Sequence, residues 1–281
     1  MIQGIGIMKI KPGNLINNSF LTIGIIGAGF VGNAIKSSYN TGATLVIRDP
    51  AKGFNSTYEE LKECEGIFIC VPSPEAHDGS CDSSILEDVL SNLKDYSGVI
   101  ISKVTATPDI YEQLQKSYPN LVYVPEFLTA ANAVSDYQKE NWAIIGGTVN
   151  AYVREAERII KFSKPDILVS YTSIGEAALC KYAVNSFLAT KVVFMNELSS
   201  LAEANGYNWS EIIPLINRDI RIGCSHMRVP GPDDFYGFGG MCFPKDTAAL
   251  LKHASNKNVD LNVLNAAVKK NSLLRLKKFK D

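Results

Sequence analysis

The best evidence for the fold is the segment Leu21-Thr-Ile-Gly-Ile-Ile-Gly-Ala-Gly-Phe-Val-Gly32. A short apolar run leads into three glycines with the spacing GxGxxG, and a helical pattern follows. In such a motif Gly27 allows a tight turn, Gly29 lets the backbone approach a pyrophosphate, and Gly32 lets the helix pack closely on the strand. Backbone N–H groups at the start of the helix then face the negative charge. The segment predicts a dinucleotide-binding turn, and the residues expected to contact the cofactor are Gly27, Ala28, Gly29, Phe30, Val31 and Gly32.

Asp49 strengthens this prediction, because it ends the next apolar run, 22 residues after Gly27. A carboxylate at that place bonds both ribose hydroxyls of NAD and repels the 2′-phosphate of NADP. Arg48 beside it keeps NADP as an alternative. A further contact is expected from Ser73 in Val71-Pro-Ser-Pro74, after the third predicted strand, although this stretch could equally be a rigid turn. We therefore expect NAD as the cofactor.

Strand and helix patterns alternate outward from this motif. Short apolar runs rich in β-branched residues are typical of strands buried on both faces, and helical segments such as 83–93 and 109–117 separate most of them. The expected strands are Leu21–Ile26, Ala43–Ile47, Gly66–Val71, Gly98–Ser102, Leu121–Val124, Trp142–Ile145 and Asp166–Val169. After Thr172 only helices are expected, at Glu176–Asn205, Trp209–Asn217, Thr247–Ser255 and from Leu261 onward.

The order of these elements predicts an α/β fold, a doubly wound Rossmann-type parallel sheet followed by an all-helical domain. Residues 1–20 are expected to form an N-terminal extension, because they are rich in Gly and Asn and show little periodicity. The NAD-binding domain is then expected over residues 21–172, and the helical domain over residues 173–260.

Composition and charge exclude several classes of protein. The chain has 28 Lys and Arg against 29 Asp and Glu, so a nucleic-acid binder with a basic surface is not expected. Uncharged apolar runs stay below the ~18 residues of a membrane span. Lys9, Lys11 and Pro12 interrupt the N-terminal apolar stretch, which argues against a signal peptide. The six cysteines include no CxxC pair, so we expect reduced thiols and a cytoplasmic protein. No metal site is expected.

Lys181 and Asn185 are the first candidate site residues in the helical half. Their i, i+4 spacing puts them on one face of the long predicted helix, among apolar neighbours. If this face is buried, a cation and an amide need polar partners there. A solvated helix edge is the alternative.

Gly237-Phe-Gly-Gly-Met-Cys-Phe-Pro-Lys-Asp246 is the second candidate. Its glycines make a backbone that can wrap closely around a ligand. Cys242 ends the loop before a helix expected to start near Asp246, which could be its N-cap. The helix N-terminus and Lys245 would both favour the thiolate. The alternative is that Cys242 is a small buried hydrophobic residue.

With these motifs in one chain, the sequence resembles the UDP-glucose/GDP-mannose dehydrogenase family from about Leu21 to Asn271. The resemblance implies a four-electron oxidation with two NAD, in which the C6 alcohol of a nucleotide sugar, most simply UDP-glucose, becomes a carboxylate. The shared motifs, in the family's order, are Gly27–Gly32, Val71–Pro74 with Asp78-Gly79, Lys103-Val-Thr105, Pro125-Glu-Phe-Leu128, Glu176–Thr190, Asp219-Ile-Arg-Ile-Gly223 and Gly237–Asp246.

The resemblance also implies roles for single residues. Cys242 matches the nucleophile that adds to the C6 aldehyde; the thiohemiacetal loses a second hydride to become a thioester, which water hydrolyses. Lys181 and Asn185 match the pair that stabilises negative charge on the C6 oxygen, and Lys181 could also take the first alcohol proton. Asp246 and Thr105 match the residues that position water.

Other matched residues are expected to hold the ligands. Arg221 matches the arginine that crosses the dimer interface to the substrate, and Glu126 matches the first glutamate of the family's Pro-Glu-Phe-Leu segment. The expected substrate contacts are Glu126, Phe127, Leu128, Lys181, Asn185, Arg221, Phe238, Gly239 and Gly240. Thr105 and Lys245 are expected to contact the cofactor.

The sequence departs from the family's pattern in four places. Ala130 replaces a second glutamate that is implicated in thioester hydrolysis, and an insertion around residues 229–235 changes the loop that embraces the sugar. The N-terminal extension is also unusual. Residues 261–281 would be the start of a truncated helix leading to the family's third domain, which binds UDP or GDP. A separate nucleotide-binding chain could supply that domain.

The resemblance further implies a homodimer formed through the helical half. On a monomer, Leu264, Val268 and Leu273 would be exposed.

Two other functions are alternatives. A two-electron dehydrogenase of the 3-hydroxyacid or 6-phosphogluconate type shares the two-domain plan and the Lys-x-x-x-Asn pair, but has no use for Cys242. A non-catalytic protein that holds NAD, or that assembles with another subunit, would fit Ala130 and the missing third domain.

Overall fold

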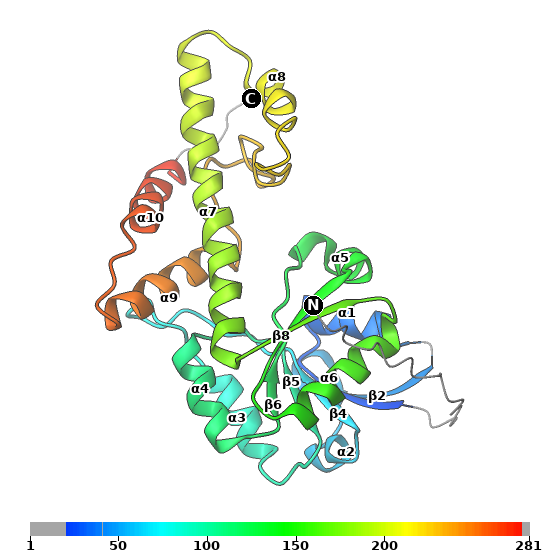
Figure 1. Ribbon diagram of the computed structural model, residues 1–281. Helices are drawn as coiled ribbons and strands as arrows, with labels where there is room; N and C mark the ends of the chain where they lie inside the picture. The colour runs from blue at the N-terminus through cyan, green and yellow to red at the C-terminus, as the bar shows by residue number, and fades with distance from the viewer. Residues whose placement is uncertain (1–20, 41, 277–281) are drawn as a thin grey trace, which may run out of the picture.

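The computed structural model describes residues 21–40 and 42–276, which form a lobe built on one sheet and a lobe of helices (Figure 1). The sheet has eight strands in the order β3-β2-β1-β4-β5-β6-β7-β8. Their bounds are β1 Leu21–Ile26, β2 Ala43–Asp49, β3 Phe54–Asn55, β4 Gly66–Ile69, β5 Val99–Ser102, β6 Leu121–Tyr123, β7 Trp142–Gly146 and β8 Leu168–Thr172. The five strands that neighbour one another in the order β2-β1-β4-β5-β6 are parallel. The predicted Rossmann-type fold is therefore confirmed.

Helices cover both faces of this sheet (Figure 1). One face packs against α1, α5 and α6, and the other against α2, α3, α4 and the first turn of α7. Neighbouring residues of one strand serve opposite cores, as Ile100 and Ile101 of β5 do, because successive side chains point to opposite faces. The bounds are α1 Phe30–Tyr39, α2 Tyr58–Lys62, α3 Ser84–Asn92, α4 Pro108–Ser117, α5 Ala133–Lys139, α6 Asn150–Ser163 and α7 Ile174–Ala204.

The sheet is less uniformly parallel than predicted. The short strand β3 pairs antiparallel with β2, and β7 is antiparallel to β6. β6 and β7 meet only where Tyr123 faces Gly146, so β7 begins beyond the carboxyl end of β6. The chain between them, residues 124–141, therefore stays at the carboxyl ends of the parallel strands, where open α/β sheets bind their ligands.

β8 is also not the doubly buried strand that its apolar run predicted. It lies at the edge of the sheet, where Leu168 is 72% exposed and Tyr171 is 54% exposed. Its observed bounds run past the predicted end at Val169 to Thr172.

The long helix α7 links the two lobes (Figure 1). Ser173 starts it through a capping box with Glu176, in which each side chain accepts a hydrogen bond from the other residue's backbone N–H. It begins two residues before its predicted start and ends at Ala204, before Gly206 at a φ of 73°. Up to residue 276, where the described part of the chain ends, three helices follow: α8 Trp209–Ile216, α9 Phe243–Asn256 and α10 Asn262–Leu274. None of the helices in the described residues is long and apolar enough to span a membrane.

α10 packs on α7 and α9. The expectation that its apolar residues are exposed on a monomer is wrong for Leu264 and Val268. Leu264 is buried against Tyr182 and Leu250, and Val268 packs beside the same cluster. Of the three residues in that expectation, Leu273 is the one that is exposed, at 63%. The N-terminal extension expected over residues 1–20 lies outside the described residues.

Candidate active site

The glycine turn after β1 has the geometry that dinucleotide binding requires. Gly27 has a φ of 91°, and a Cβ there would lie 2.6 Å from the carbonyl oxygen of Cys70. A Cβ on Gly32 would lie 1.9 Å from the carbonyl oxygen of Gly27. Gly29, the N-cap of α1, has open space around it instead. The turn is thus tight on the protein side and open where a pyrophosphate would approach the first N–H groups of α1.

Asp49 lies beside this turn at the end of β2. Its Oδ2 accepts a hydrogen bond from the Ala28 N–H at 2.8 Å. Lys52 closes the same corner by donating to the Ala28 carbonyl at 2.7 Å. Arg48 points elsewhere, donating to the Ser56 carbonyl at 2.8 Å and stacking on the Tyr58 ring. The residues present therefore fit the ribose of NAD, with no guanidinium turned toward it.

A buried polar cluster lies where α7 and α9 meet the loop after β6. Lys181 Nζ is 3.1 Å from Glu126 Oε1 and also donates to the Glu126 carbonyl. Asn185 Nδ2 donates to Asp246 Oδ2 at 2.6 Å, and Lys245 Nζ donates to Asp246 Oδ1 at the same distance. Lys181, Glu126, Asn185 and Asp246 are each at most 6% exposed. The alternative of a solvated helix edge for Lys181 and Asn185 is excluded.

Cys242 lies beside this cluster, close enough for electrostatic interaction with both carboxylates and both lysines. Its predicted setting needs two corrections. α9 begins at Phe243, because Pro244 fits the first turn of a helix, so Cys242 is the N-cap and Asp246 lies inside the first turn. Burial raises the pKa of the Cys242 thiol, and Asp246 and Glu126 add to the rise, while Lys181 and Lys245 oppose it. The pKa of Cys242 is therefore raised, whereas the sequence led us to expect a stabilised thiolate and so a lowered pKa.

Thr105 and Ser73 follow neighbouring strands and are both buried. Cys81 lies near both of them and near Lys245 of the buried cluster. Its Sγ donates to the Thr105 carbonyl at 3.4 Å, and Ser73 and Lys245 both affect its pKa. All six cysteines are free thiols.

Lys103 belongs to the same buried region, and the sequence analysis did not single it out as a site residue. It is 6% exposed and donates to the Pro125 carbonyl at 3.3 Å. Burial lowers its pKa, and Glu140 and Glu126 oppose that shift. Lys103 directly follows β5 at the ligand-binding edge of the sheet, and that position was the available signal in the sequence.

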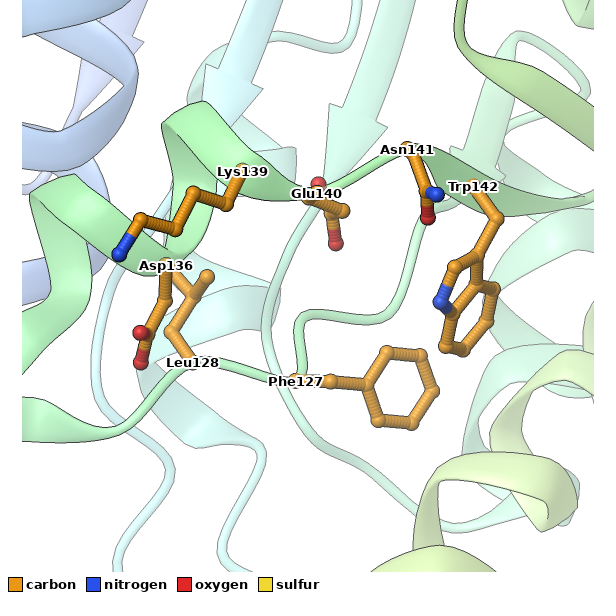
Figure 2. Close-up of a pocket in the computed structure, with 7 residues that line it drawn as sticks. All are labelled: Phe127, Leu128, Asp136, Lys139, Glu140, Asn141 and Trp142. Carbon is orange, nitrogen blue, oxygen red and sulfur yellow. The ribbon is translucent and has the colours of Figure 1, made fainter.

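Phe127 and Leu128 line a pocket of about 230 Å³ beside the cluster. Figure 2 shows the Phe127 ring against the Trp142 indole at one end, with Leu128, Asp136 and Lys139 at the other. The two ring centroids are 4.9 Å apart. The Phe127 ring also lies 5.3 Å from Lys181 Nζ. This pocket therefore adjoins the buried cluster through Phe127.

Phe238, Gly239 and Gly240 line a second and larger cavity, of about 480 Å³. It lies between α7 and the loop that carries the insertion, and the Arg228 and His226 side chains also line it. Phe238 itself is buried, at 4% exposure.

Arg221 is not brought into this site. Its side chain is 85% exposed and pairs with Asp219 two residues away. Ala130 is also exposed, in a short 3₁₀ helix over Ala130–Asn132. The carboxylates near Cys242 are therefore Glu126 and Asp246. In the described part of the chain no three His, Cys, Asp or Glu residues gather as a metal site.

The curated proteins similar in sequence to this chain include UDP-glucose 6-dehydrogenases. The chain is 32% identical to the UDP-glucose 6-dehydrogenase of Rickettsia felis over 233 residues, which cover 78% of this chain and 50% of that protein. It is 36% identical to the putative UDP-glucose 6-dehydrogenase YtcA of Bacillus subtilis over 221 residues, which cover 73% of this chain and 50% of that protein. The chain thus spans about half the length of the curated relatives it matches.

Structural comparison agrees on the fold. A UDP-glucose dehydrogenase from Pyrobaculum islandicum superposes with a TM-score of 0.78 at 23% identity, covering 93% of this chain and 70% of that one. Residues 43–162 match the NAD-binding domain of the UDP-glucose/GDP-mannose dehydrogenase family, and residues 175–273 match its central domain. The chain belongs to the UDP-glucose/GDP-mannose dehydrogenase family, and its cofactor is NAD.

Proposed function

We propose that this chain oxidises the C6 alcohol of a nucleotide sugar to a carboxylate, with UDP-glucose as the first candidate substrate and the cytoplasm as its location. The observation that carries the proposal is the proximity of Cys242 to Lys181 and to Asp246, which Asn185 holds, in a chain that also has an NAD-type turn. A nucleophilic thiol is what a four-electron oxidation needs and a two-electron oxidation does not.

Lys181 serves the first half of the reaction in this proposal. Bound NAD supplies the hydride acceptor for both oxidation steps. The C6 alcohol passes a proton to Lys181 Nζ as it loses hydride, and the ammonium group so formed, together with the Asn185 amide, stabilises the negative charge that develops on oxygen. Glu126 holds the ammonium in place from a distance of 3.1 Å.

Cys242 serves the second half. An aldehyde carbon has to become tetrahedral before it can lose another hydride, and the thiolate makes that adduct by adding to C6. Loss of hydride leaves a thioester. Water then attacks the thioester carbon and expels the Cys242 thiolate, which gives the carboxylate. In the proposal Asp246, fixed by Asn185 and Lys245, and Thr105 position that water.

The remaining assignments follow the same geometry. We assign the NAD contacts to the residues of the glycine turn with Asp49, Ser73, Thr105 and Lys245. We assign sugar contacts to Glu126, Phe127, Leu128 and the loop Phe238–Gly240. The matched half of the relatives leaves nucleotide binding open, so a separate nucleotide-binding chain belongs to the proposal as an optional partner.

An NADH assay tests the proposal directly. Purified protein is incubated with NAD and either UDP-glucose or GDP-mannose, with and without a candidate nucleotide-binding chain. We expect about two NADH for each substrate consumed. One NADH from a small 3-hydroxyacid, with none from sugar nucleotides, would favour the two-electron alternative. Calorimetric NAD binding without any turnover would identify a non-catalytic protein.

We further propose a homodimer through α7. Leu179, Phe187, Phe194 and Leu201 follow one another at intervals of seven or eight residues and are 48% to 67% exposed. This spacing puts them on one face, as in a helix seam between two chains. Arg221 is exposed and lies away from the buried cluster of its own chain, so in a dimer it would be able to contact the second protomer.

Light scattering at micromolar concentration measures this association. We expect a dimer for the wild type and a monomer for Phe194→Glu. Leu168→Glu is the matched control, because Leu168 is also exposed, at 72%, but lies on β8, and it should leave the dimer intact. A monomeric wild type would refute the dimer.

A further inference from the structure

Two buried asparagines hold the backbone of the glycine-rich loop just before Cys242. Asn271 of α10 makes two hydrogen bonds to the same residue: its Oδ1 accepts from the Phe238 N–H at 2.7 Å, and its Nδ2 donates to the Phe238 carbonyl at 3.0 Å. Asn196 of α7 accepts from the Gly237 N–H at 3.0 Å. Asn196 is 1% exposed and Asn271 is 8% exposed. Neither had been singled out from the sequence.

The loop backbone fits these side chains without spare room. A Cβ on Gly237 would lie 2.3 Å from Asn271 Oδ1, and Gly237 also has a φ of 75°. A Cβ on Gly239 would lie 2.8 Å from the Arg275 guanidinium. Arg275 in turn pairs with Asp233 at 2.8 Å, so α10 also holds the inserted part of the loop. Glycine is needed here for close approach to α10, as well as for closeness to a ligand.

We infer that Asn271 and Asn196 are positioning residues, which fix the path of the Phe238–Met241 backbone and thereby the placement of the Cys242 thiol. The effect on turnover rests on the proposed function, in which Cys242 is the nucleophile. The effect on the loop itself does not.

The reason for such a device lies in the loop's own composition. Gly237, Gly239 and Gly240 carry no side chains that could anchor the loop by packing, and glycine loses the most conformational freedom on folding. Hydrogen bonds from two separate helices fix the backbone at this end of the loop, where the buried Phe238 side chain is the apolar anchor. A displacement of about 1 Å in a reacting group can lower a rate by about 10²-fold, so a loop that ends in a nucleophile needs a fixed path.

Hydrogen exchange and kinetics together test the inference. In Asn271→Ala we expect the Phe238 amide to exchange about tenfold faster or more, because it loses its hydrogen bond, and the Gly237 amide beside it to follow as the loop loosens. We expect kcat to fall by about 10- to 100-fold, while the KM for NAD stays within about twofold. Asn196→Ala should give the same pattern more weakly. The control is Ser272→Ala, since Ser272 is exposed on α10 and bonds only the Val268 carbonyl.

Asn271→Ser guards against a loss of folding. It adds no buried charge and retains a hydroxyl group that can accept from the Phe238 N–H, so intermediate exchange and intermediate kcat are expected. Unchanged exchange at residues 237–238 in Asn271→Ala would overturn the inference. Faster exchange with wild-type kcat would overturn its link to catalysis. A wild type that makes no NADH would refute the proposed function, and the exchange data would still decide whether the two asparagines hold the loop.

Discussion

Cys242→Ala is expected to lower steady-state NADH formation from a nucleotide sugar by about 10³-fold or more. The first oxidation, from alcohol to aldehyde, does not require a thiol. The aldehyde formed then has no nucleophile to make it tetrahedral, so the variant should stop at one NADH for each active site. Rapid-quench measurement of NADH against enzyme concentration distinguishes this single equivalent from the two expected of the wild type.

Cys224→Ala is the matched control for this variant. Cys224 is exposed and lies in the loop that leads toward the site, so its loss should leave NADH formation within about twofold. A Cys242→Ala enzyme that still released two NADH per substrate would remove the thiol from the mechanism and would favour water alone as the nucleophile.

The ionisation of Cys242 gives this thiol a characteristic pH dependence. Burial raises its pKa above the usual value for a cysteine, with Asp246 and Glu126 acting in the same direction. Below the pKa the group is a neutral thiol, so the reactive thiolate increases as pH rises. Alkylation of Cys242 by iodoacetamide, followed by mass spectrometry, should therefore still be accelerating at pH 9 in the free protein. A rate that levels off near pH 7 would show a thiolate stabilised by its surroundings.

Lys181→Met is expected to lower kcat/KM by about 10²- to 10³-fold and to destabilise the fold by about 3 kcal/mol. The rate falls because the positive charge facing the C6 oxygen is lost. The stability falls because Glu126, 5% exposed, is left as a buried carboxylate without its cation. Kinetics and urea denaturation measure the two effects separately.

The double variant Glu126→Gln/Lys181→Met separates charge burial from catalysis. Removing both charges takes away the uncompensated carboxylate, so most of the lost stability should return. The activity should not return, because the ammonium is still missing. If the double variant regained wild-type turnover, Lys181 would be a structural partner of Glu126 and nothing more.

The parts of the structure that could be predicted from the sequence depend on local rules. The glycine turn could be predicted because its steric requirements involve only six consecutive residues. In the structure, Gly32 lies so close to the Gly27 carbonyl that a side chain there would clash. Asp49 could be placed because the end of a strand is easy to find. α7 could be predicted because a long stretch without Pro or Gly ends at Gly206.

The parts that could not be predicted depend on contacts between distant segments. No local pattern pairs Asn271 with Phe238 or buries Lys103 beneath Pro125. Leu264 and Val268 look unpartnered in sequence, and only the packing of α10 on α7 and α9 covers them. The pKa of Cys242 was predicted in the wrong direction for a similar reason. The effects of the helix N-terminus and of Lys245 could be inferred from the sequence, whereas the extent of burial and the proximity of the Glu126 carboxylate could not.

The hydrogen bond between Asp49 and the Ala28 N–H also bears on how the cofactor arrives. Because the carboxylate is held by the turn already, an incoming ribose does not have to immobilise a freely rotating side chain, which would cost about 0.5–1.5 kcal/mol. That entropy is lost when the chain folds. The ribose-binding side chain at the end of β2 is therefore preorganised, and we expect little reorganisation of the protein there as the dinucleotide binds.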